Sequence, residues 1–392
     1  MADFILKPGR EKSLKRKHPW VFDGAIAERR GRYKAGDTVN LLDSDRQFLA
    51  KGTVSPESSI LVRVWSFDPN EPVDHALIKR RLDMAIAARE SFDPKAGRRL
   101  VHGESDGMPS LVVDQYDQVI VVQFGAMAAE RWRETVVAHL AKRLNPTAIY
   151  ERSDSDGRRY EGLEPETGLL HGGLPDSVII EENGVKMLVD VAGGHKTGAY
   201  LDQRDNRLFV QQHARAKRVL NTFCYTDGFG LHAAKGGATE VVSVDSSASA
   251  LEIARHNVSL NPDLNIGSFN WCEADVFGFL REQVDGGERY DMVILDPPKF
   301  VKSVKHVDRA ARAYKDIAML GAKLLNPGGM LVNFSCSSAM SLDLFRKVTA
   351  SAFSDANVDG CLIKTLHAPR DHWVSMAFPE GDYLKGFVTV SR

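Results

Sequence analysis

Met292-Val293-Ile294-Leu295-Asp296-Pro297-Pro298-Lys299 is an apolar run that ends in a carboxylate and two prolines. A short, continuously apolar run is typical of a strand buried on both faces of a parallel sheet. A second such run, Met330-Leu331-Val332, leads into Asn333-Phe334-Ser335-Cys336-Ser337. Because open α/β sheets bind ligands beyond the carboxyl ends of their strands, we expect both segments at one ligand-binding edge.

Strands and helices alternate around these two segments, from about residue 186 to residue 392. Strand-like runs occupy 219–223, 240–245, 270–272, 291–295, 330–332 and 386–390. Helices are expected from the capping residues Ser246 and Ser247 to Val258, and from Val307 to Leu324 with a turn at 326–329. This alternation predicts a parallel sheet with right-handed crossovers, and therefore an α/β, Rossmann-like domain over 186–392.

The first half of the chain predicts two further domains. Residues 1–70 hold short strands separated by turns, which indicates a small β-rich, barrel-like domain. Residues 68–72 contain two prolines and are interpreted as a linker. Residues 73–185 combine helix-period stretches, at 76–91 and 128–143, with several strand-like runs. They are therefore predicted to form a middle α+β domain.

The composition excludes several classes of protein. With a net charge of −1, 43% hydrophobic and 26% charged residues, the chain is an ordinary globular sequence. No apolar run reaches the roughly 20 residues that cross a bilayer, and the N-terminus lacks a signal-peptide core, so a cytoplasmic location without membrane contact is expected. None of the four cysteines forms a C-x-x-C pair, and a calcium-loop-like start at Asp154 lacks its glutamate at the twelfth position, Pro165. No metal site is expected.

Positive charge gathers at the N-terminus. Residues 1–34 contain ten lysines and arginines against four acids, and Trp20 and Phe22 lie among them. Cations that contact phosphates, with aromatic rings that stack on bases, suit an RNA surface, for which Lys15, Arg16, Lys17 and Trp20 are the candidates. The alternative is a solvated basic face with the aromatic residues in a small core.

A nucleotide-type site is predicted after the first strand of the Rossmann-like domain. Gly228-Phe229-Gly230-Leu231-His232-Ala233 fits G-x-G-x-x-A, a pattern that lets the backbone approach a ligand closely. Asp245 ends the next strand, where an acid can bind both ribose hydroxyls, and Asp275 follows the third strand, where it could accept the adenine amino group. Turn or helix-cap roles remain the alternatives for both acids. Nicotinamide and S-adenosylmethionine enzymes share this layout.

Asp296 favours methyl transfer over hydride transfer. A dehydrogenase needs no proline-locked carboxylate at the end of this strand, whereas a methyltransferase must hold its substrate base beside the methyl donor at that point. The prolines fix φ and remove backbone donors, so the loop can be rigid. A simple turn role for Asp296 is the alternative.

Cys336 is the candidate nucleophile. Cytosine C5 is a poor nucleophile, and thiolate addition at C6 converts the ring to an enamine whose C5 can attack a methyl group. Cys224, Cys272 and Cys361 are interpreted as small buried hydrophobes, whereas Cys336 lies at a strand end between two serines. Asp296 would protonate or polarise the cytosine ring during the addition, which requires a raised carboxyl pKa. No residue is assigned as the base that removes the C5 proton.

These segments resemble a known family, the bacterial ribosomal RNA large subunit methyltransferase I group, and the resemblance runs nearly end to end. It is carried by Lys15–Phe22, Gly103–Gly107, Gly194–Gly198, Tyr200–Asp205, Asp296–Phe300, Tyr314–Ile317, Ser335–Ser337 and Leu384–Phe387. The resemblance implies an N-terminal PUA domain, a middle α+β domain and a class I methyltransferase domain. It also implies formation of 5-methylcytosine in 23S rRNA with S-adenosylmethionine as the donor.

Site roles follow from the motifs together with the resemblance. Cys336 and Asp296 are the expected catalytic residues, and Lys196–Arg204 is implied to help close the donor pocket. The residues expected to bind the donor are Gln203, Arg204, Tyr225, Asp227, Gly228, Gly230, Asp245, Asp275 and Asp296. Asp227 departs from the family pattern, in which a glycine is common, and it could instead cap the following helix.

Other functions remain open on the sequence alone. A guanine-N7 or other N-methyltransferase would need no thiol, a nicotinamide oxidoreductase would share the nucleotide fold, and an RNA-binding assembly factor would use an inactive methyltransferase domain. The expected partner is 23S rRNA or a precursor of the large ribosomal subunit. The oligomeric state is open, with a homodimer among the alternatives, and so is the nucleotide that is modified.

Overall fold

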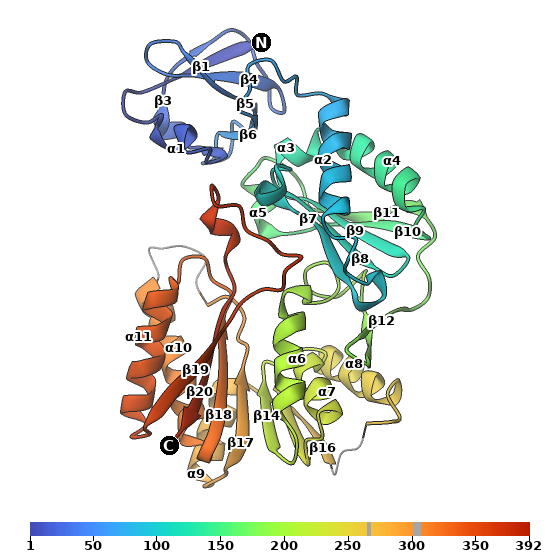
Figure 1. Cartoon of the computed structure of the whole chain (residues 1–392), viewed down its shortest axis with the longest axis vertical. Helices are drawn as coiled ribbons and strands as arrows, with labels where there is room; N and C mark the ends of the chain where they lie inside the picture. The colour runs from blue at the N-terminus through green and yellow to red at the C-terminus, as the bar shows by residue number, and fades with distance from the viewer. Residues whose placement is uncertain (265–267, 301–306) are drawn as a thin grey trace. The chain divides into compact units, whose positions relative to one another are not determined.

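The computed structural model describes residues 1–264, 268–300 and 307–392, and these form two compact units (Figure 1). The first unit contains residues 1–180, 189–201 and 370–381, and the second contains 181–188, 202–369 and 382–392. The segments 189–201 and 370–381, which the sequence places in the Rossmann-like domain, thus belong to the first unit. The predicted three-domain division stays a prediction.

The N-terminal part of the first unit is a six-stranded sheet with the order β2-β6-β5-β4-β1-β3. Its strands are β1 (Ala2–Leu6), β2 (Trp20–Val21), β3 (Ile26–Arg30), β4 (Thr38–Leu42), β5 (Phe48–Val54) and β6 (Val62–Ser66), with the short helix α1 (Lys12–Lys15). Alternating residues such as Phe4, Val39 and Leu41 are fully buried in its core, as expected for strands with one face inward. The β-rich N-terminal domain is confirmed.

The rest of the first unit is built on a five-stranded sheet with the order β11-β10-β9-β8-β7. Its elements are α2 (His75–Ala87), β7 (Arg98–His102), β8 (Leu111–Tyr116), β9 (Val119–Phe124), α3 (Met127–Glu130), α4 (Arg133–Leu144), β10 (Ala148–Ser153), α5 (Asp156–Arg159) and β11 (Glu166–Gly172). Asp74 caps α2 by accepting from the backbone N–H groups of Ala76 and Leu77. The helix ends at Ala87, four residues before the predicted end.

A seven-stranded sheet with the order β16-β15-β14-β17-β18-β20-β19 forms the centre of the second unit. Its strands are β14 (Arg218–Thr222), β15 (Glu240–Asp245), β16 (Ser268–Glu273), β17 (Tyr290–Leu295), β18 (Leu325–Ser335), β19 (Gly360–Leu366) and β20 (Lys385–Ser391). The first five run parallel, and β20 is antiparallel to both of its neighbours. The chain order reverses beside β14, the position where open α/β sheets bind ligands.

Helices cover both faces of this sheet (Figure 1). They are α6 (Arg204–His213), α7 (Gly228–Lys235), α8 (Ala248–Ser259), α9 (Val276–Asp285), α10 (Val307–Lys323) and α11 (Leu342–Asp355). Side chains of α9, α10 and α11 share one apolar core with the sheet, whereas α6 and α7 share another. β12 (Val178–Glu182) and β13 (Val185–Val189) form a separate two-stranded sheet. The parallel α/β architecture is confirmed.

The predicted turn at 326–329 is wrong in one respect, because these residues lie within β18. β18 starts at Leu325, opposite Tyr290, and the pairing shifts by an irregularity before it resumes between Met330 and Met292. Gly328 has φ +77°, so the turn-like composition marks a distortion inside the strand and not its boundary. Among the described residues, no helix has both the length and the apolar character needed to cross a membrane.

Candidate active site

Asp296 and Cys336 follow the ends of two neighbouring parallel strands. β17 ends at Leu295, which pairs with Asn333 near the end of β18. Both side chains are partly exposed, whereas the strand residues before them, Leu295 and Phe334, are fully buried. The expectation that the two segments share the carboxyl edge of one sheet is thus met by the strand register.

Tyr314 on α10 interacts electrostatically with both Asp296 and Cys336. Burial raises the pKa of Tyr314 to about 12, and the charges of Cys336 and Asp296 contribute in the same direction. Its ring packs on Phe300 and Phe345, with centroid distances of 4.8 Å and 5.6 Å. A neutral phenol and an aromatic wall therefore border the edge on which the thiol and the carboxylate lie.

Lys385 also lies at this edge, and sequence reasoning gave it no role. It pairs with Ser335 across β18 and β20, and its Nζ donates to the carbonyl oxygens of Ser337 and Tyr383, each at 2.8 Å. The only sequence signal was its place in the Leu384–Phe387 motif. Lys385 lies near Ser335 and Ser337 only because β20 pairs antiparallel with β18, and the hydrophobic pattern of the sequence does not predict that pairing.

The loop between β14 and α7 is strained. Phe223, Tyr225 and Asp227 have φ values of 54°, 51° and 66°, although none of them is a glycine. Non-glycine residues at positive φ are uncommon and gather at ligand-binding sites. The strain is held by Asp245 at the end of β15, whose Oδ2 accepts from the backbone N–H of Tyr225 at 2.8 Å.

Asp245 keeps capacity for a ligand. Its Oδ1 accepts from the backbone N–H of Ser247 at 3.0 Å, and Ser247 itself caps α8 as predicted. A carboxylate has about four lone-pair sites, so the bonds from Tyr225 and Ser247 leave about two for other donors. A ribose with two adjacent hydroxyls fits this arrangement.

Asp227 lies inside the domain. It is fully buried and accepts from Asn221 Nδ2 at 2.8 Å, Ser243 Oγ at 2.7 Å and Trp271 Nε1 at 3.0 Å. Burial raises the pKa of Asp227 to about 6, and the hydrogen bonds from Ser243, Asn221 and Trp271 oppose that rise. A Cβ on Gly230 would lie 2.1 Å from Asp227 Oδ1, so this glycine makes room for the carboxylate.

The remaining donor-site candidates have structural partners as well. Asp275 caps α9 by accepting from the backbone N–H of Gly278 at 2.8 Å, which is the alternative role considered from the sequence. Gln203 is buried and accepts from Asn206 Nδ2 at 2.6 Å, and Arg204, also buried, forms an ion pair with Asp205. Their roles in donor binding stay predictions.

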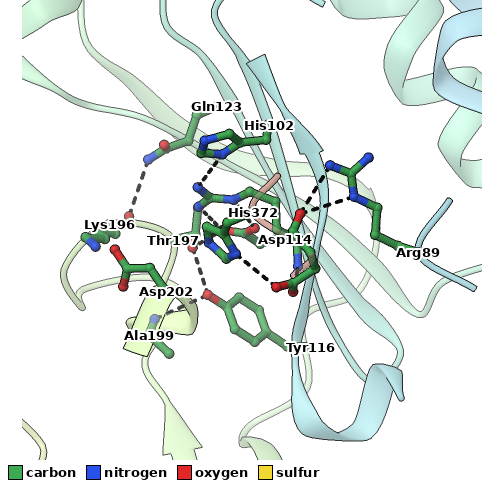
Figure 2. Close-up of polar contacts among 12 residues, drawn as sticks. Arg89, His102, Asp114, Tyr116, Gln123, Lys196, Thr197, Ala199, Asp202 and His372 are labelled. Carbon is green, nitrogen blue, oxygen red and sulfur yellow. Dashed lines mark hydrogen bonds and ion pairs between the residues drawn. The ribbon is translucent and has the colours of Figure 1, made fainter. Parts of the chain in front are cut away.

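The Lys196 segment is anchored within the first unit (Figure 2). Thr197 Oγ1 donates to Asp114 Oδ2 at 2.7 Å and hydrogen-bonds with the hydroxyl of Tyr116, also at 2.7 Å. The Lys196 ammonium lies 4.2 Å from the ring centroid of Tyr200. Buried hydrogen bonds from Thr197 to Asp114 and Tyr116 thus hold this segment against β8.

The candidate RNA-binding residues divide into two kinds. Lys15, Arg16 and Lys17 are exposed at the end of α1. Trp20 is half-buried, donates from Nε1 to Glu104 Oε1 at 2.8 Å, and packs edge-on against Phe378. The indole therefore has a structural role, whereas neighbouring Phe22 is 50% exposed. Trp20 and Phe22 help to line a cavity of about 410 Å³ together with Arg10 and Lys12.

Comparison with known proteins identifies the family. Residues 98–362 match the S-adenosylmethionine-dependent methyltransferase family, and residues 4–67 match the PUA-like domain. Proteins named ribosomal RNA large subunit methyltransferase I are 49% identical in Shewanella frigidimarina and 46% identical in Cronobacter sakazakii, with 98% of each chain covered. The chain belongs to this family. It is a methyltransferase, and S-adenosylmethionine is its methyl donor.

Solved structures agree with the fold. A Streptococcus mutans protein assigned as an S-adenosylmethionine-dependent methyltransferase superposes with a TM-score of 0.85 at 22% identity, and both chains are covered completely. A second methyltransferase structure, solved as a complex with SAH, gives a TM-score of 0.86 at 21% identity, again over both complete chains. The expected PUA and Rossmann-like methyltransferase domains are confirmed.

Proposed function

We propose that this protein methylates C5 of a cytosine in 23S rRNA through a covalent bond between Cys336 and C6 of the base. The observation that carries the proposal is the placement of Asp296 and Cys336 at the ends of adjacent parallel strands. The relatives are named as large-subunit ribosomal RNA methyltransferases, which supports rRNA as the substrate.

The chemistry assigns one task to each group. The Cys336 thiolate forms a bond to C6, the electron pair of the C5–C6 double bond shifts to C4–C5, and the C4–N3 pair shifts to N3. N3 then takes a proton, which leaves an enamine with a nucleophilic C5. C5 then takes the methyl group that S-adenosylmethionine supplies. Loss of the C5 proton restores the C5–C6 double bond and expels the Cys336 thiolate. The N3 proton returns to the Asp296 carboxylate, so the enzyme is regenerated.

Asp296 is the proposed partner of the cytosine N3 and N4 atoms. Its proline-fixed position after β17 lets it hold the base while Cys336 adds, and a protonated carboxyl there supplies the ring proton. A target base inside an RNA helix would have to leave its stack to reach this edge.

Donor and RNA binding complete the proposal. Asp245 binds the ribose, and the strained Tyr225 loop, Gly228 and Gly230 approach the rest of the donor. We extend this donor site to Gln203, Arg204, Asp275 and Asp296, whereas Asp227, which is fully buried, supports the strands below it. Lys15, Arg16 and Lys17 contact RNA phosphates, while Trp20 supports that surface. We infer a cytoplasmic location, because the relatives are named for a ribosomal RNA substrate.

The product nucleoside tests this proposal. The protein is incubated with methyl-labelled S-adenosylmethionine and 23S rRNA from a strain that lacks it, and the RNA is digested to nucleosides. We expect labelled 5-methylcytidine by mass spectrometry. Labelled 7-methylguanosine or another N-methylated nucleoside as the main product would replace the proposal with an N-methyl transfer that needs no thiol.

A further inference from the structure

Lys385 is a buried cation without a carboxylate partner among the described residues. The side chain is 5% exposed, and its two hydrogen-bond acceptors, the carbonyl oxygens of Ser337 and Tyr383, are neutral. Burial lowers the pKa of Lys385, because an ammonium is costly to remove from water without a counter-charge. A group that favours the charged form is therefore expected nearby.

Five described groups bear on the charge of this region, and one of them is Asp296, whose carboxylate acts on Tyr314 together with Cys336. Asp382 and an ionised Cys336 favour the Lys385 ammonium, whereas Lys299 disfavours it. Asp382 and Lys299 are exposed, so water screens their effects. Tyr314 faces the same thiol and stays neutral. A Cys336 thiolate is thus the less-screened counter-charge for Lys385.

The hydrogen bonds of Lys385 also fix the backbone around the thiol. β20 pairs Lys385 with Ser335, the residue before Cys336, and the Nζ atom reaches the carbonyl of Ser337, the residue after it. An ammonium has three N–H groups, and the carbonyls of Ser337 and Tyr383 engage two of them. The third is available for an acceptor on the same turn.

We propose that Lys385 is a positioning residue for Cys336, which holds the 335–337 turn and keeps the thiol ionised before the base arrives. This inference rests on the proposed role of Cys336 as nucleophile. An ammonium close to a thiol favours its ionised form. The Nζ atom of Lys385 is bound to the Ser337 carbonyl, on the residue directly after Cys336.

Alkylation of Cys336 tests the proposal without RNA. The full chain is treated with iodoacetamide across a pH series, and the Cys336 peptide is followed by mass spectrometry. We expect Lys385→Met to move the midpoint of the pH profile upward by about one unit or more, with a roughly ten-fold slower reaction at pH 7. Lys385→Arg, which keeps the charge, restores most of the rate.

Two matched variants separate charge from structure. Lys385→Gln can still donate to the Ser337 carbonyl, and we expect the same upward shift, which also decides the matter if Lys385→Met fails to fold. Asp382→Asn removes only a screened charge, so its profile should match the parent protein. Unchanged midpoints in folded Lys385→Met and Lys385→Gln would overturn the proposal.

The outcome is distinguishable from a failure of the proposed function. If the parent protein makes 5-methylcytidine and the midpoints do not move, only the role of Lys385 is wrong. If the parent protein makes no 5-methylcytidine, the function itself is wrong, whatever the alkylation profiles show.

Discussion

Replacing Cys336 with alanine is expected to lower the rate of methyl transfer to 23S rRNA by about 10⁴-fold or more, the scale seen when a covalent nucleophile is removed. Without the bond to C6, cytosine C5 carries too little electron density to attack a methyl group. Single-turnover assays with labelled S-adenosylmethionine measure the rate. Calorimetry should show unchanged donor binding, because the proposed donor-binding residues do not include this thiol.

Cys361 supplies the matched control. It is also a free, partly buried cysteine, but it lies on β19, two strands away from β18 in the sheet order. Cys361→Ala should therefore retain the parent rate within about two-fold. A Cys336→Ala protein that binds the donor and still methylates at the parent rate would exclude the covalent route.

The second large effect is expected at Glu182, which belongs to a buried charge cluster. Its carboxylate accepts from Arg207 Nε and a second guanidinium nitrogen at 2.8 Å and 2.7 Å, and His232 Nε2 lies 3.2 Å away. Burial alone would raise the pKa of Glu182, but the charge and hydrogen bonds of Arg207, with His232, lower it to about 2. This ion pair fixes α6 and α7 beside the donor loop.

Glu182→Gln removes the carboxylate that two Arg207 guanidinium nitrogens bind, and breaking such a buried pair costs about 3–5 kcal/mol of unfolding free energy. Urea unfolding measures the loss. Asp343→Asn is the control, since its exposed partner Lys347 contributes under about 1 kcal/mol. A Glu182→Gln protein as stable as the parent would contradict the ion-pair role.

The Glu182–Arg207 ion pair also predicts how the free energy of unfolding changes with pH. Because the folded pKa of Glu182 is about 2, below the unfolded value of 4.5, its stabilisation is complete above about pH 4.5. It should be lost as the pH falls toward 2, by about 3 kcal/mol in total. Glu182→Gln should remove this part of the acid dependence.

The parallel sheet, and the shared edge at which Asp296 and Cys336 lie, could be predicted because both depend on local sequence patterns. Apolar runs of three or four residues, Met292–Leu295 and Met330–Val332, mark buried strands. Asp296 follows the first run directly, and Cys336 follows the second run after three further residues. Parallel strands place such residues at one edge by geometry alone. No knowledge of side-chain packing was needed for that step.

Other features depend on contacts between distant segments. Lys385 reaches the Cys336 turn only because β20 returns antiparallel to β18. The burial of Asp227 comes from donors on three different strands, so its sequence position after β14 looked like a ligand contact. Trp20 similarly looked free to stack on a base, but its indole bonds to Glu104, 84 residues away.

The most direct test of the account is a covalent trap. The protein is incubated with S-adenosylmethionine and 23S rRNA that carries 5-fluorocytidine, whose fluorine blocks the final proton loss from C5. We predict a complex that survives denaturation, with the modified nucleotide attached to the Cys336 peptide by mass spectrometry. Methylation of ordinary rRNA together with no trapped complex, or attachment at another cysteine, would contradict the central role of Cys336.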